Sequence, residues 1–276
     1  MGRGVLSLEQ PAVVGILNVT PDSFSDGGRF LDAAAALEQA ARLVAAGAHM
    51  LDVGAESTRP GRPEPVSVEE EWRRLEPVLH ELTVRHPAVP VSVDTVKAET
   101  AARALAAGAW AVNDVSGLRL DPEVADVCAE HGAGLVLMHS RGSVSEMAGY
   151  EHATYDAVVD DVIRELEAAV EVALGRGVAR ERIVLDPGLG FSKRPEQNYA
   201  VLRGLPSLVA LGRPVMVGPS RKRFLGAVTG GDVGERDAAT ATACAAACLG
   251  GASLFRVHAV QPVRDALAIA HAIRSA

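Results

Sequence analysis

The fold of this chain is constrained above all by a regular alternation of short apolar runs and longer stretches of helical periodicity. Eight runs rich in Val, Leu and Ile are each followed by a helical stretch, which is the pattern of repeated strand–helix units. The predicted strands are 13–18, 50–53, 91–94, 111–113, 135–138, 183–186, 215–217 and 254–257. The predicted helices are 32–46, 67–85, 96–107, 122–131, 155–176, 197–205, 236–249 and 262–273. Several strands are apolar throughout, so both of their faces must be covered.

Eight such units predict an α/β protein with a single (β/α)8 TIM barrel, and a doubly wound open parallel sheet is the alternative. The length of 276 residues fits one barrel, which takes roughly 250 residues. Because no linker rich in Ser, Gly and Pro interrupts the alternation, a single domain over 1–276 is expected. Aromatic side chains make up only 4% of the chain, and small apolar residues suit closely packed parallel strands.

Polar side chains stand at the end of nearly every predicted strand. They are Asn18, Asp52, Asp94, Asn113 with Asp114, His139, Asp186, Ser220, and Arg256 with His258. In a barrel these ends meet at one face, where barrel enzymes build their active sites. Asp and Asn also begin turns and cap helices, so any one of them alone could be structural. The set as a whole predicts an active site at the carboxyl ends of the strands.

Two segments after the first two predicted strands are rich in turn-forming residues and are expected to be loops at the mouth of the barrel. The segment 18–28 presents a carboxamide, hydroxyls and carboxylates, the hard oxygen groups that suit a magnesium ion shared with a phosphate. The segment 56–61 adds a guanidinium and a hydroxyl, as an anion clamp requires. A solvated connection is the alternative for both segments.

Charge and cysteine content restrict the partners and the compartment. A formal net charge of −8 argues against a general nucleic-acid surface, because neutralising phosphates requires clustered Lys and Arg. Cys128, Cys244 and Cys248 lie in alanine-rich helical stretches and are expected to be buried, reduced thiols. No segment has the roughly 18 consecutive apolar residues of a membrane span. A cytoplasmic protein without nucleic-acid or membrane partners is therefore expected.

The polar strand ends and the two loops belong to a set of short motifs. They are 15–28 (GILNVTPDSFSDGG), 52–61 (DVGAESTRPG), 92–95 (SVDT), 113–117 (NDVSG), 137–139 (LMH), 185–191 (LDPGLGF), 220–222 (SRK) and 256–258 (RVH). In this combination, from about 14 to 260, the chain resembles the dihydropteroate synthase family of pterin-binding enzymes. The resemblance implies a transferase of folate biosynthesis that joins 6-hydroxymethyl-7,8-dihydropterin pyrophosphate to para-aminobenzoate and releases pyrophosphate. It also implies a barrel, dependence on Mg²⁺ and a homodimer.

The resemblance assigns the pterin ring to Asp94, Asn113, Met138 and Asp186. A carboxylate can accept the paired ring N–H and amino group of a pterin, so Asp186 is the expected anchor of the ring. Asp94 is the expected electrostatic catalyst, because positive charge spreads into the ring as the pyrophosphate leaves and a carboxylate stabilises that charge. Met138 is the expected apolar wall of the slot.

The remaining expected site residues face the leaving group and the second substrate. Arg256 and His258, just before a helix expected near Gln261, would neutralise the pyrophosphate. The resemblance also implies that Asn18 holds Mg²⁺, that Thr58 contacts the pterin substrate and that Arg59 helps to close the loops over it. It places Lys222 between the pterin and para-aminobenzoate, Phe191 against the aromatic ring, and Arg223 near the aminobenzoate carboxylate. Asp94, Lys222, Arg256 and His258 are the expected catalytic residues.

The sequence departs from the usual pattern of the family at three places. Arg223 replaces a small hydroxyl residue, Ala259 replaces an Asp, and 191–194 is Phe-Ser-Lys-Arg where Phe-Gly-Lys-Thr is usual. Two other functions are open: a methyltransferase that acts on methyltetrahydrofolate, and a degenerate paralogue that binds pterins for another purpose. The two loop motifs, with Lys222, Arg256 and His258, favour the synthase over both.

Overall fold

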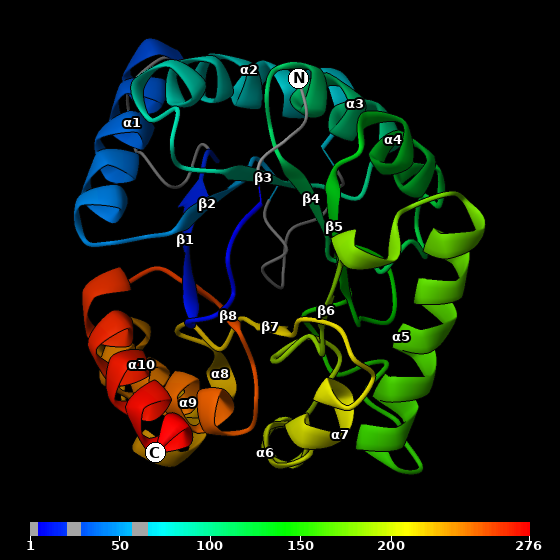
Figure 1. The fold of residues 1–276 in the computed structure, drawn as a ribbon, viewed down its shortest axis with the longest axis vertical. Coiled ribbons are helices and arrows are strands. Elements are labelled where there is room, and N and C mark those ends of the chain that lie inside the picture. Colours follow the sequence, from blue (N-terminus) through cyan, green and yellow to red (C-terminus); the bar gives the residue numbers. More distant parts are fainter. Residues whose placement is uncertain (1–4, 21–28, 57–65) are drawn as a thin grey trace.

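The computed structural model describes residues 5–20, 29–56 and 66–276, which form a barrel of parallel strands inside a ring of helices (Figure 1). The strands are β1 (Ala12–Asn18), β2 (Met50–Gly54), β3 (Val91–Asp94), β4 (Ala111–Asp114), β5 (Gly134–Met138), β6 (Ile183–Asp186), β7 (Met216–Val217) and β8 (Leu254–Val257). Strand β1 pairs in parallel with both β2 and β8. A bridge between Leu185 and Val215 joins the β6 and β7 sides of the sheet. The sheet closes on itself through this bridge, so the TIM barrel is confirmed and the open sheet is wrong.

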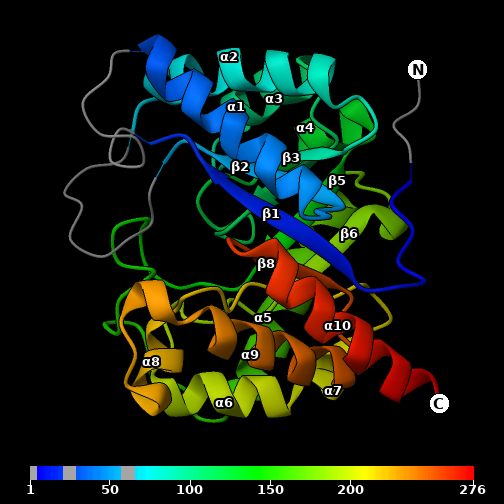
Figure 2. The same cartoon turned by 90° about the vertical axis from the view of Figure 1, so that its left-hand side faces the viewer.

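The helices follow the strands in the order expected of repeated βα units. They are α1 (Arg29–Ala45), α2 (Val68–Arg85), α3 (Ala98–Ala106), α4 (Glu123–His131), α5 (Val158–Gly175), α6 (Pro195–Arg203), α7 (Leu205–Val209), α8 (Arg223–Thr229), α9 (Asp237–Leu249) and α10 (Val260–Ser275). Figure 2 shows α9 and α10 side by side, with α10 packed outside β1. In the described part of the chain, none of the helices is both long and apolar enough to cross a membrane.

The inside of the barrel is built in two layers of different chemistry. Its amino-terminal layer is an apolar cluster contributed by alternate strand positions: Ala12, Val14, Met50, Ala111, Val136, Met216 and Leu254. Side chains of a strand alternate between its faces, so the next inward position on β2 after Met50 is Asp52, and the next on β8 after Leu254 is Arg256. The barrel is therefore plugged by apolar side chains below and is lined by polar ones at its carboxyl-terminal mouth.

The other strand face packs against the surrounding helices. Leu17, Leu51, Val53, Val93 and Leu135 are all fully buried in a large cluster with apolar helix residues. Small side chains are the outer partners on α9, where Ala243, Cys244, Ala247 and Cys248 are buried. The three cysteines of the chain are buried and form no disulfide, as the sequence predicted.

Candidate active site at the mouth of the barrel

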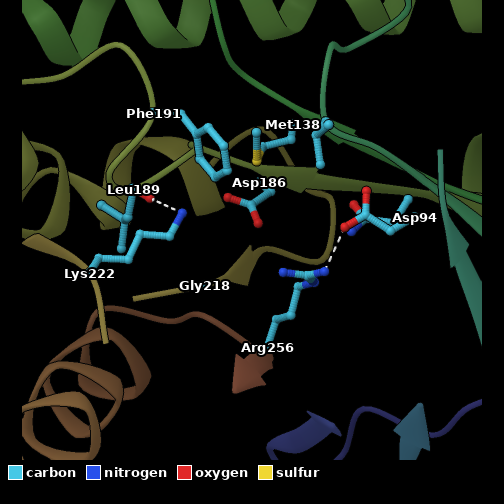
Figure 3. A pocket seen from close by; sticks show the side chains of 10 residues that line it. Asp94, Met138, Asp186, Leu189, Phe191, Gly218, Lys222 and Arg256 are labelled. Atoms are coloured by element: carbon cyan, nitrogen blue, oxygen red, sulfur yellow. Dashed lines mark hydrogen bonds and ion pairs between the residues drawn. The ribbon is translucent and has the colours of Figure 1, made fainter. Parts of the chain in front are cut away.

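The pocket at the carboxyl ends of the strands draws its walls from six elements or the loops that follow them (Figure 3). It is lined by Asp94, Asn113, Val115, Met138, Asp186, Leu189, Phe191, Gly218, Lys222 and Arg256. Parallel pairing brings several of these side chains together, because Asp94 stands opposite Asn113, and Met138 stands opposite Asp186. The structure therefore gathers seven of the residues predicted from sequence in one pocket: Asp94, Asn113, Met138, Asp186, Phe191, Lys222 and Arg256.

A guanidinium shared by two carboxylates forms one wall of the pocket. Arg256 donates from Nε to Oδ2 of Asp52 at 2.5 Å and from Nη2 to Oδ2 of Asp94 at 2.6 Å. Asp52 is buried and also accepts hydrogen bonds from Ser92 and Asn113. Burial raises the pKa of Asp94, although the Arg256 guanidinium opposes this shift. The carboxylate at this wall is thus held in place by Arg256, with a pKa above its ordinary value.

Asn113 carries a buried acceptor that has no partner in the described structure. Its Nδ2 donates to Oδ2 of Asp52 at 3.1 Å, which fixes the orientation of the amide. Its Oδ1 is buried and has no hydrogen-bond partner among the described residues. Such a group is costly unless a ligand satisfies it. The amide oxygen is therefore suited to accept a hydrogen bond from a donor bound in the pocket.

Asp186 lies at the end of β6 and is 3% exposed. Its Oδ1 accepts a hydrogen bond from the Gly188 amide at 2.7 Å, so part of the carboxylate holds the turn that follows the strand. Figure 3 shows the carboxylate at the centre of the pocket, between Lys222 and Arg256. Burial raises its pKa, and the hydrogen bond from Gly188 and the nearby cations oppose this shift. One carboxylate thus serves both the turn and the pocket.

Lys222 and Phe191 form the opposite wall. The Lys222 Nζ lies 3.6 Å from the centre of the Phe191 ring and donates to the carbonyl oxygen of Leu189 at 2.6 Å. Burial lowers the pKa of Lys222, with Asp186 opposing the shift. The ring also belongs to an apolar cluster with Val115 and Met138. The pocket is consequently a slot with apolar sides and charged ends.

His258 lies beside the pocket at the start of α10. Ser220 Oγ accepts from the His258 amide at 3.1 Å and lies 2.9 Å from His258 Nδ1. The hydroxyl, which has already accepted that hydrogen bond, can donate its own proton to Nδ1, and this leaves Nε2 protonated. Helix α10 begins at Val260, so His258 and Arg256 lie close to its amino terminus, as the sequence predicted.

Arg223 is exposed and does not line the pocket. It is the first residue of α8, donates to the carbonyl oxygen of Ala148, and lies 4.6 Å from the centre of the Tyr150 ring. The guanidinium thus stands at the rim, held by the segment between β5 and α5. The predicted contact between Arg223 and the second substrate would therefore lie at this rim and not inside the pocket.

Three of the predicted site residues concern metal binding or the loops. Asn18 is half-buried at the carboxyl end of β1, beside Gly54 of β2. In the ranges that the structure describes, there is no group of three or more His, Cys, Asp or Glu side chains that could hold a metal ion. A single carboxamide oxygen fits a Mg²⁺ ion whose other ligands are phosphate oxygens and water. Thr58 and Arg59 lie outside the described residues.

Two residues of this region were given no individual role in the predicted site. Asp52 was expected only as a polar strand end, and it proves to hold both Arg256 and Asn113. Lys193 was noted only as part of a departure from the family pattern, yet it is 1% exposed and hydrogen-bonded to His139 behind the pocket. A signal for Asp52 existed in the alternation along β2, whereas nothing in the sequence indicated that Lys193 turns inward.

A barrel with this slot at its mouth defines an enzyme that binds a flat heterocycle between apolar walls and holds it with buried acceptors. The comparison with known proteins gives the family. The model of a family described as pterin binding enzyme matches residues 14–258. The dihydropteroate synthase of Mycobacterium leprae (strain TN) is 46% identical over 272 residues, which cover 96% of this chain and 94% of the relative.

Solved structures agree with the sequence comparison. Dihydropteroate synthase of Xanthomonas albilineans with 4-aminobenzoic acid has a TM-score of 0.90 and 43% identity, covering 98% of this chain and 96% of that chain. The same enzyme in complex with 7,8-dihydropteroate has a TM-score of 0.87 and 41% identity, with 98% and 96% covered. The chain therefore belongs to the pterin binding enzyme family, and within it to the dihydropteroate synthases, which are transferases of folate biosynthesis.

Proposed function

We propose that this chain condenses 6-hydroxymethyl-7,8-dihydropterin pyrophosphate with para-aminobenzoate to give 7,8-dihydropteroate and pyrophosphate. The observation that carries the proposal is the pair of acceptors in the slot, the unpartnered Oδ1 of Asn113 and the central carboxylate of Asp186. A pterin edge offers ring N–H and amino donors, which these acceptors match. Met138 and Phe191 supply apolar walls for the faces of the ring.

The reaction replaces a carbon–oxygen bond with a carbon–nitrogen bond. The bond between the methylene carbon and the pyrophosphate oxygen breaks, the amine nitrogen of para-aminobenzoate bonds to that carbon, and the amine loses a proton. Positive charge develops on the pterin side as the anion departs. Asp94 at the wall of the slot stabilises this charge, and Arg256 fixes the position of its carboxylate.

The leaving group is recognised by a cation, Arg256, by an imidazole N–H donor, His258, and by a helix end. His258 and Arg256 lie just before the amino terminus of α10, where backbone N–H groups favour an anion. We place Mg²⁺ on Asn18, where it would offset the charge of the pyrophosphate, with the remaining ligands from phosphate and water. Thr58 and Arg59 complete the proposed contacts to the pterin substrate.

The second substrate is placed next to the Lys222–Phe191 wall. An aromatic amine with a carboxylate fits a phenyl ring with an ammonium beside it, because the ring packs on Phe191 and the cation lies near the reacting groups. Arg223 at the rim supplies a guanidinium for the carboxylate of para-aminobenzoate. The usual small hydroxyl at this position would bind the same carboxylate without charge.

A direct assay tests the proposed function. The purified protein is incubated with dihydropterin pyrophosphate, para-aminobenzoate and MgCl₂, and dihydropteroate and pyrophosphate are quantified together. We expect both products in equal amounts, and omission of Mg²⁺ should reduce their rate of formation. Pterin binding without either product would contradict the proposal and favour a paralogue that only binds pterins.

We also propose a homodimer that uses the α9–α10 face. Ile269 and Ile273 lie one turn apart on α10 and are 65% and 62% exposed, and Leu249 at the end of α9 is 49% exposed. An apolar stripe of this kind is suited to an isologous contact. Light scattering of Ile269→Glu should give half the mass of the unmodified protein; an unchanged mass would exclude this face.

We further propose a cytoplasmic location, without nucleic-acid or membrane partners. Three buried cysteines without a disulfide are compatible with a reducing compartment. The net charge of −8 disfavours a general phosphate-binding surface. Fractionation of the producing cells would test the location.

A further inference from the structure

The loop that follows Asp186 carries two lining residues of the pocket, Leu189 and Phe191, and has an unusual backbone. Gly188, Gly190 and Ser192 all have positive φ, at 67°, 77° and 46°. For Ser192 this left-handed conformation is unfavourable, so surrounding contacts must hold it. The position of the Phe191 ring therefore depends on the groups that form hydrogen bonds with the backbone of this loop.

Most carbonyl groups of the loop are satisfied by side chains. Leu189 O accepts from Lys222, Ser192 O accepts from the Tyr155 hydroxyl at 2.8 Å, and Lys193 O accepts from Asn198 at 3.0 Å. The carbonyls of Gly188 and Phe191 both accept from the Nζ of Lys193, each at 3.2 Å. One ammonium group thus joins the two ends of the turn on which the Phe191 ring is mounted.

The third hydrogen bond of that ammonium anchors the loop to the barrel. Lys193 Nζ lies 2.9 Å from Nδ1 of His139, the residue that follows β5. His139 Nε2 lies 3.0 Å from Oε2 of Glu165 on α5, so its proton is on Nε2 and its Nδ1 is the acceptor. The Lys193 ammonium thereby donates all three of its protons, to two carbonyls and one imidazole.

Lys193 is nevertheless separate from the reacting groups. Its side chain is fully buried, and it is not among the residues that line the pocket. Burial lowers its pKa to about 7, with Asp186 opposing the shift. A charge in such a place is costly, so a purely apolar side chain of similar size would pack there at lower cost if the site required only volume.

We infer that Lys193 is a positioning residue for the second substrate: its ammonium fixes the backbone of 188–191 and thereby sets the Phe191 ring against Lys222. The assignment of para-aminobenzoate to this wall rests on the proposed function. One loop would then serve both substrates. Asp186 at its start anchors the pterin, and Lys193 at its end fixes the Lys222–Phe191 wall where para-aminobenzoate binds.

The test replaces Lys193 by Met, which keeps the length of the side chain and removes its donors. We expect the KM for para-aminobenzoate to rise about tenfold while the KM for dihydropterin pyrophosphate changes less than about threefold. Leu267→Ala is the matched control, because it removes buried volume from α10 and leaves the loop intact. It should lower the stability and leave both KM values unchanged.

A double-mutant cycle identifies the route of the effect. If Lys193 acts through the Phe191 ring, Phe191→Ala combined with Lys193→Met should have a KM for para-aminobenzoate within about twofold of Phe191→Ala alone. Multiplying effects would overturn the inference, and so would an equal rise in both KM values for folded Lys193→Met. If the Met variant does not fold, Lys193→Gln retains an amide donor and should give a smaller rise in the same direction.

Hydrogen exchange separates this inference from the proposed function. In folded Lys193→Met, the amides of Phe191 and Ser192 should exchange at least about tenfold faster than in the unmodified protein, and those of Leu267→Ala should not. If the unmodified protein forms no dihydropteroate, the proposed function fails, but the exchange data still decide whether Lys193 holds the loop. Unchanged exchange in Lys193→Met would overturn the inference whatever the activity.

Discussion

Arg256 Nη2 lies 2.6 Å from Oδ2 of Asp94, and the same guanidinium donates from Nε to Asp52 at 2.5 Å. One cation from β8 is thus shared by carboxylates from β2 and β3. The sequence suggested Arg256 as a cation for pyrophosphate, and the structure adds a second function. Its charge is matched before any substrate arrives, so it also fixes the Asp94 carboxylate that lines the pocket.

Removing Arg256 should therefore destabilise the fold through its partners. Arg256→Met leaves two carboxylates near each other without a cation, and the expected cost is about 3–5 kcal/mol. Adding Asp52→Asn removes one orphaned charge, so the double variant should be more stable than Arg256→Met alone. Urea denaturation of both variants and of Asp52→Asn measures the coupling. Additive losses would show that the two residues do not interact energetically.

Asp94→Asn should lower turnover more than binding. The amide keeps the shape of the carboxylate and loses the charge that stabilises the developing cation, so kcat should fall by about 10²–10³. The Kd of the pterin substrate should change by less than about fivefold. Single-turnover kinetics and equilibrium binding give the two quantities. A loss confined to Kd would mean that Asp94 only binds the ring.

Much of this site could be predicted from the sequence because barrel geometry converts strand ends into neighbours. Asp94, Asn113 and Asp186 needed only the position of each strand end to be placed together, whereas Met138 was assigned from the resemblance to the family. The strands and most helices were predicted from their hydrophobic patterns, which are long enough to recognise. The short helices α7 and α8 were missed, because five and seven residues show no period.

Contacts that depend on loops and on side-chain direction could not be predicted. Lys193 would ordinarily be a solvated charge, and its burial depends on carbonyls that face inward only because Gly188, Gly190 and Ser192 have positive φ. Arg223 is the opposite case, since the resemblance to the family placed its position beside the second substrate and α8 places the side chain on the rim. Backbone conformation in short loops decides both outcomes.

Asp186→Asn should abolish tight pterin binding. The amide replaces one acceptor oxygen by a donor that faces the donors of the ring, so the Kd should rise by about 100-fold. Asp161→Asn is a suitable control, because Asp161 is a buried carboxylate at the start of α5 that pairs with Arg164. Calorimetric titration with a pterin provides the measurement. Normal affinity in Asp186→Asn would exclude its role as the anchor of the ring.

A methyl group at Gly188 should disrupt the site by displacing the loop that follows Asp186. A Cβ there would lie 1.9 Å from the carbonyl oxygen of His139, so the loop must move away from β5. Gly132→Ala is the control: Gly132 also has positive φ, at 56°, but its Cβ would meet nothing within 4 Å. The control should lose about 1–2 kcal/mol. Gly188→Ala should lose more, together with pterin affinity; equal losses by thermal unfolding would contradict the close approach.

The buried imidazole of His139 should make the stability depend on pH. Burial, reinforced by the Lys193 cation, lowers the pKa of His139 to about 4 from 6.5. As the pH falls from 6.5 to 4, the His139 imidazole becomes protonated in the unfolded chain and stays neutral in the folded chain. The contribution of the neutral His139 imidazole to the free energy of unfolding is thus fully present above pH 6.5. It is lost towards pH 4, where the free energy of unfolding is lower by about 3 kcal/mol. Hydrogen bonds from His139 and Arg141 lower the pKa of Glu165 to about 2 despite desolvation, which adds a loss in the same direction below pH 4.5.

The variant His139→Gln separates the contribution of the imidazole to this pH dependence from that of the carboxylates of the protein. Gln has no ionisable group, so the free energy of unfolding should fall less steeply between pH 6.5 and 4 than in the unmodified protein. Urea titrations at four pH values across this window give the two slopes. The variant is expected to be less stable at pH 7, because the link between Lys193 and Glu165 is weakened. Parallel slopes would mean that His139 is charged in the folded protein, and the Lys193 ammonium would then face a second cation at 2.9 Å.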